Sequence, residues 1–79
     1  MIRKLQITAP ETNSKYPLGH RCQIIERDTG EVWFEAHGVT KDQAIERVSV
    51  LANGLELAGI EISLWPSYKW PMIMVERFG

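Results

Sequence analysis

Residues 20–58 decide the fold expected for this chain, and they read HRCQIIERDTGEVWFEAHGVTKDQAIERVSVLANGLELA. Their first half holds two stretches, 20–27 and 31–37, in which apolar and polar side chains alternate as in β-strands. The connection places Asp28 early and Gly30 late, which suits a type I turn closed by a glycine bulge. The pattern therefore predicts a β-hairpin with one apolar face.

The second half of the stretch has the features of a helix. Thr40-Lys41-Asp42-Gln43 matches a capping box, in which the Thr40 hydroxyl accepts a bond from the Gln43 amide and the Gln43 side chain returns one. Gly59 is a suitable residue just beyond the helix end, so we expect a helix over residues 41–58. At 100° per residue its apolar positions fall in one arc that should lie across the sheet. They are Ala44, Ile45, Val48, Leu51, Ala52, Leu55 and Ala58.

The flanking segments add three more expected strands. Alternation over residues 2–8 predicts a strand with Leu5 and Ile7 facing the core, and residues 9–19 are rich in breakers and predict a loop. Residues 60–65 and 72–78 predict two strands that pair in antiparallel fashion. The expected fold is one small α+β domain over residues 1–79. Its element order is β-β-β-α-β-β, with one amphipathic helix packed on a curved antiparallel sheet.

Composition narrows the class of protein. The chain has 79 residues, is 44% hydrophobic and 24% charged, and carries a formal net charge of −1. That charge argues against a dedicated DNA-binding domain. No apolar run approaches the roughly 20 residues that span a bilayer, so no membrane partner is expected. Its single cysteine, Cys22, excludes an intrachain disulfide and favours a cytoplasmic protein. A domain this small is marginally stable, and self-association would help it.

Catalytic, metal and cofactor sites are not expected. His20, Cys22 and His37 are the only residues near one another in the predicted hairpin with the chemistry of a nucleophile and base. No third group at fixed spacing would orient an imidazole, and a structural zinc site usually needs four ligands. Glycines are scattered singly, without a phosphate-binding loop. We therefore expect a non-enzymatic protein with no cofactor, and a buried, structural Cys22.

Two groups of apolar residues favour protein–protein contact. One is a helix stripe opposite the core arc, whose glycine would allow close approach of another element. The other gathers aromatic and methionine side chains, which are enriched at interface cores. The candidate partner-binding residues are Val50, Gly54 and Leu57 on the helix, and Trp65, Tyr68, Trp70, Met72 and Met74 after it. Against this reading, isolated exposed apolar residues are ordinary and the aromatic residues could belong to the core.

We expect the protein to be a small regulatory or inhibitory module. It would bind another protein, or bind a second copy of itself to form a homodimer. Small phage and mobile-element inhibitors share this profile of size and composition. The alternative is a single-stranded nucleic-acid binder, in which Trp33 stacks on bases. Arg21, Arg27 and His37 would surround that ring, although Glu35 shares its face.

A family resemblance covers residues 22–58. The hairpin, Gly38-x-Thr40 and an amphipathic helix that begins around Ala44 resemble the HicB-type antitoxin domain. The Pro-Asp-x-Pro-Gly stretch of that family is replaced here by residues 34–38, Phe-Glu-Ala-His-Gly. Many unrelated small domains share this outline, and no function is carried over from it.

Overall fold

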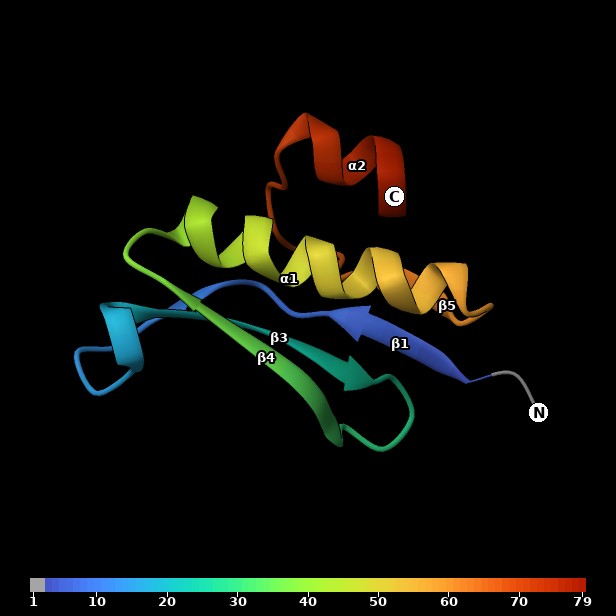
Figure 1. Ribbon diagram of the computed structural model, residues 1–79, viewed down its shortest axis with the longest axis horizontal. Helices are drawn as coiled ribbons and strands as arrows, with labels where there is room; N and C mark the ends of the chain where they lie inside the picture. The colour runs from blue at the N-terminus through green and yellow to red at the C-terminus, as the bar shows by residue number, and fades with distance from the viewer. Residues whose placement is uncertain (1–2) are drawn as a thin grey trace.

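The computed structural model describes residues 3–79 as a five-stranded sheet that carries two helices on one face (Figure 1). This architecture confirms the α+β class and the main helix packed on the sheet. The elements are β1 (Lys4–Ile7), β2 (Glu11–Thr12), a 3-10 turn η1 (Pro17–Gly19), β3 (His20–Glu26), β4 (Val32–Gly38), α1 (Lys41–Leu57), β5 (Glu61–Leu64) and α2 (Met72–Phe78).

The predicted hairpin forms, with β3 inside the sheet and β4 at its edge. β3 and β4 pair in antiparallel fashion, with Cys22 opposite Ala36 and Ile24 opposite Phe34. Gly30 closes the turn with a φ of 76°, the left-handed conformation that a glycine bulge requires. On its other edge β3 pairs with both β1 and β2. The alternation of apolar residues thus identified both strands and the buried Cys22, Ile24 and Ala36, but Val32 and Phe34 of the predicted apolar face are 45% and 39% exposed.

The sheet is mixed rather than wholly antiparallel, which corrects one expectation. β5 pairs in parallel with β1, with Leu5 opposite Ile62. Between β4 and β5 the chain crosses over through α1, and a helical crossover is the usual route to a parallel pair. β5 therefore lies at an edge of the sheet, beside the first strand.

Both ends of α1 follow from local sequence. The Thr40 hydroxyl accepts a bond from the Gln43 amide at 3.0 Å, as expected, but the Gln43 side chain accepts from the Val39 amide at 2.8 Å, one residue before the cap. At the other end the amide of Ile60 donates to the Leu55 carbonyl at 3.1 Å. This bond closes the helix around Gly59, whose φ is 88°.

The buried stripe of α1 is narrower than the predicted arc. Leu51 is 39% exposed and Ala58 is exposed, whereas Leu55 is half-buried. The stripe consists largely of small side chains, so the helix can lie close to the sheet while its larger leucines remain at the margin. The fully buried residues of α1 are Ala44, Ile45, Val48 and Ala52.

The strand predicted over residues 72–78 is wrong, because this segment is the helix α2. The Pro71 carbonyl accepts from the amide of Met74 at 2.9 Å and from that of Val75 at 3.2 Å. Met74 and Phe78, four residues apart, are 2% and 6% exposed and complete the core. Burial at a spacing of four is helical, so the antiparallel strand pair across residues 66–71 does not exist.

The predicted loop over residues 9–19 also contains regular structure. Pro10 is buried and separates β1 from β2, and η1 follows. Leu18, inside η1, has a φ of 62° and is 53% exposed. In the first strand Leu5 and Ile7 are buried as predicted, while the expected contribution of Ile2 lies outside the described residues.

Candidate functional site

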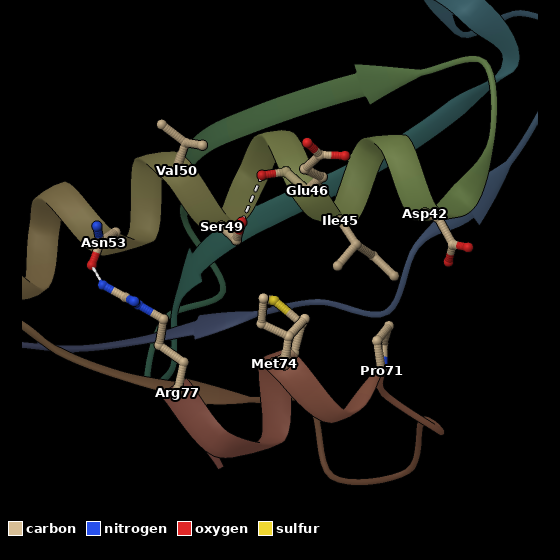
Figure 2. Close-up of a pocket in the computed structure, with 10 residues that line it drawn as sticks. Asp42, Ile45, Glu46, Ser49, Val50, Asn53, Pro71, Met74 and Arg77 are labelled. Atoms are coloured by element: carbon tan, nitrogen blue, oxygen red, sulfur yellow. Dashed lines mark hydrogen bonds between the residues drawn. The ribbon is translucent and has the colours of Figure 1, made fainter.

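A groove of about 500 Å³ runs between α1 and α2. The two helices run in the same direction, since Pro71 lies across from Asp42 and Arg77 lies across from Asn53 (Figure 2). The volume of the groove falls within the range of about 300–1,000 Å³ that is typical of ligand sites. The lining residues are Asp42, Ile45, Glu46, Ser49, Val50, Asn53, Pro71, Ile73, Met74 and Arg77.

The groove has an apolar floor and exposed apolar walls. Ile45 and Met74 point toward one another at its base and are 3% and 2% exposed (Figure 2). Val50 on α1 and Ile73 on α2 are 69% and 71% exposed. Large aliphatic side chains this exposed that line one groove mark a contact surface more often than isolated ones do.

A polar contact joins the two helices at one end of the groove. The Arg77 guanidinium donates to the side-chain carbonyl of Asn53 (Figure 2). Beyond it lies an adjoining hollow lined by Glu56, Ile73, Glu76 and Arg77. Because the groove and the hollow share Ile73 and Arg77, they form one continuous surface along the helix pair.

The predicted helix stripe lies on the exposed side of α1. Val50 forms part of the groove wall, and Leu57 is 85% exposed at the helix end. A Cβ built on Gly54 would meet no atom within 4 Å. Contacts within the described chain therefore give no reason for a glycine at this position.

The structure divides the predicted aromatic and methionine cluster. Tyr68 and Trp70 pack partly against the core, with their rings edge to face at 4.8 Å. The Trp70 indole also donates to the Trp65 carbonyl at 2.8 Å, so this segment is folded onto itself. Trp65 and Met72 are 42% and 70% exposed. Met74 is a core residue, 2% exposed, and it meets the groove only as part of its floor.

Trp33 lies in a different setting from the predicted nucleic-acid face. It sits at the irregularity where the register of β3 and β4 shifts, and it packs against the core. The cation over its ring is Arg3, at 5.1 Å from the centroid. Arg21 stacks instead on Tyr16 at 4.2 Å. Arg21, one of the cations expected around Trp33, is therefore engaged elsewhere.

Two of the remaining candidates are engaged on the open face of the sheet. Arg21 also pairs with Glu11 at 3.3 Å, and His37, its cross-strand neighbour, lies 3.3 Å from a Glu35 carboxylate oxygen. Arg27 is exposed beside the hairpin turn. The Glu11 and Glu35 carboxylates beside Arg21 and His37 reduce the positive potential available to a phosphate backbone.

Cys22 has the environment of a structural residue. It is fully buried, and its thiol donates to the Thr8 carbonyl at 3.1 Å. Burial, helped by the nearby Glu11 charge and opposed by a backbone hydrogen bond from Gln23, raises the pKa of the Cys22 thiol to about 12. A thiol that stays protonated at neutral pH is a poor nucleophile and a poor metal ligand. The His20 ring shares a hydrogen bond of 2.9 Å with the Thr12 hydroxyl. Within residues 3–79, no group of three side chains is placed to bind a metal.

Comparison of the chain with protein-family models, curated proteins and solved structures finds no match. No helix within residues 3–79 is long and apolar enough to cross a membrane. The functional argument therefore rests on the chemistry of the described surfaces.

Most of the groove was missed by reasoning from the sequence alone. Of its lining residues, only Val50 and Met74 had been singled out as contact residues, and Met74 is the buried one. The groove exists because residues 72–78 are helical and lie beside α1 (Figure 2). The available signal was Pro71 at the start of the segment and the four-residue spacing of Met74 and Phe78.

Proposed function

We propose that this chain is a small, non-enzymatic protein-binding module that holds a partner protein against the face formed by α1 and α2. The groove between these helices, with its exposed Val50 and Ile73, is the observation that carries the proposal. Binding there would mask a surface of the partner, which is the action of a regulatory or inhibitory protein. The single cysteine, buried and unpaired, agrees with action in the cytosol.

The energetic support comes from the apolar area that this face leaves in water. Complete burial of an aliphatic side chain of this size contributes about 1.5–3 kcal/mol. Val50 and Ile73 retain most of that contribution, because more than two thirds of each is exposed. Leu57 and Met72, at 85% and 70%, extend the apolar surface beyond the groove. A partner that buries the central pair therefore gains affinity without disturbing the core.

The walls of the groove are also held in place before any partner arrives. Ile45 on α1 and Met74 on α2 both belong to the buried core, and the Arg77–Asn53 bond links the two helices. A surface that is ordered beforehand loses little conformational entropy on binding.

The test is a selection of displayed random 16-residue peptides on the wild-type protein, followed by binding to a Val50→Ser/Ile73→Ser double variant. Groove-dependent binders, meaning peptides that bind through the groove, should have about tenfold or more lower affinity for the double variant, because it lacks two apolar side chains of the contact surface. Val32→Ser is the matched control, because Val32 is 45% exposed on β4, outside the groove. Circular dichroism should show all proteins folded. A selection in which every binder tolerates the double variant contradicts the proposal.

The same variants test the homodimer. If a second copy occupies this face, sedimentation velocity should show wild-type dimers and monomers of the Val50→Ser/Ile73→Ser protein. Wild type and double variant should show the same monomer if the natural partner is a different protein. A dimer that persists in the double variant would place self-association on another surface.

A further inference from the structure

We propose that the segment held by the α1–α2 groove is a basic amphipathic helix of another protein. This inference rests on the proposed function and specifies the chemistry of the partner. Its evidence is the distribution of charge around the groove and the shape of the groove between the two helices.

The charge around the groove is strongly negative. Four carboxylates line the groove and its adjoining hollow, against the single guanidinium of Arg77, so the surface described here has a local formal charge of −3. The whole chain carries only −1. The four are Asp42, Glu46, Glu56 and Glu76.

These carboxylates are not neutralised within the described chain. The ion pairs among residues 3–79 involve Glu11, Glu26 and Glu35, none of which lines the groove. Arg77 is itself bonded to Asn53. A rim of uncompensated carboxylates around an apolar floor attracts lysine and arginine and repels phosphate and acidic chains.

The same charges argue against a second copy as the occupant. In a two-fold symmetric dimer each copy presents the same patch to the other. Contact through this face would bring the four carboxylates of one copy against those of the other, and like charges across an interface oppose association. Charge complementarity therefore favours a partner of different sequence.

The shape of the groove suits a helix. The groove-facing positions of α1 run from Asp42 to Asn53, which at 1.5 Å per residue is about 16 Å, or three turns. A helix laid along this length would place apolar residues at positions i, i+3 or i+4, and i+7 between Val50 and Ile73. Its flanking positions would then lie beside the carboxylates of the rim. An amphipathic helix with lysine or arginine on both flanks matches both features.

The charge preference is tested with the same displayed peptide library. Groove-dependent binders selected on wild type should carry a net positive charge and helical apolar spacing. Selection on a Glu46→Lys/Glu76→Lys variant should shift the binders toward acidic peptides. Glu31→Lys/Glu61→Lys is the matched control, since both carboxylates are exposed and lie outside the groove, and it should leave the preference basic.

The best basic peptide should then be measured by fluorescence anisotropy. Glu46→Gln/Glu76→Gln should weaken binding of this peptide several-fold near 0.05 M salt. As the salt concentration rises to about 0.3 M, the double variant should lose less affinity than wild type. A copy with the same composition in scrambled order should bind about tenfold or more weakly, because it loses the apolar face. Equal binding of the scrambled peptide would reduce the interaction to unspecific charge and overturn the inference.

The remaining outcomes separate the two proposals. Groove-dependent binders that are neutral or acidic, or a preference that ignores the lysine substitutions, would overturn the basic helix and leave the protein-binding face standing. Dimers formed through this face in wild type would identify a second copy as the occupant and overturn the inference. Absence of any groove-dependent binder or dimer would refute the proposed function itself.

Discussion

The pair Met74→Ala and Met72→Ala tests the assignment of α2 with the same chemical change at two sites. Met74 is 2% exposed and belongs to the core, whereas Met72 is 70% exposed. Truncation of a buried methionine to alanine costs about 2–5 kcal/mol, and a surface change stays within about 0.5 kcal/mol. Total stability in a small domain lies near the lower end of about 5–15 kcal/mol, so Met74→Ala should remove a large part of it.

Urea unfolding followed by tryptophan fluorescence measures the difference directly. At about 4–8 °C per kcal/mol, Met74→Ala should also lower the melting temperature by at least about 8 °C, and Met72→Ala by a few degrees at most. Met74→Leu, which keeps the volume, should recover most of the loss. On a strand with period two, the side chains at 72 and 74 would share one face. Equal losses for the two alanine variants would therefore refute the helix.

Two further predictions concern single residues. Because burial raises the pKa of the Cys22 thiol to about 12 from 9.0, the unfolded chain loses this proton first as the pH rises. Between those pH values the free energy of unfolding of the wild type should therefore fall, relative to that of Cys22→Ala, by up to about 1.4 kcal/mol per pH unit. Rapid reaction of the native thiol with a disulfide reagent would contradict its burial. Leu18→Asn should raise the free energy of unfolding by up to about 1 kcal/mol in urea titrations, because asparagine tolerates the φ of 62° better than leucine. Leu18→Ala keeps the backbone strain and should not raise the free energy of unfolding. If alanine stabilises the protein as much as asparagine does, relief of strain is not the cause.

The sequence predicted the elements whose signals are local. The hairpin followed from alternation and from Asp28 and Gly30 in the turn, and α1 followed from Thr40 and Gly59 at its ends. These signals act through hydrogen bonds and steric limits within a few residues, so they do not depend on the rest of the fold. The observed bounds of α1 differ from the prediction by one residue.

The sequence did not predict features that depend on tertiary context. In residues 72–78, β-branched Ile73 and Val75 favour a strand, while the core selects Met74 and Phe78 and thereby a helix. Short apolar segments are ambiguous in this way, because packing outweighs the small differences in intrinsic preference. The parallel pairing of β5 with β1 has the same origin, since residues 72–78 form a helix and supply no strand for β5.

This one reassignment also determines where the candidate site lies. A helix distributes the side chains of α2, so that Phe78 enters the core and Ile73 and Arg77 line the groove, while Met74 belongs to the core and also forms the groove floor. Substitution of Phe78 should therefore act on stability and substitution of Ile73 on partner binding, whereas substitution of Met74 should act on both. An alternating strand would instead place 73, 75 and 77 on one face, and the acidic rim of α1 would have no opposite wall. Variants at Phe78 and Ile73 therefore measure the stability of the C-terminal helix and the binding surface separately.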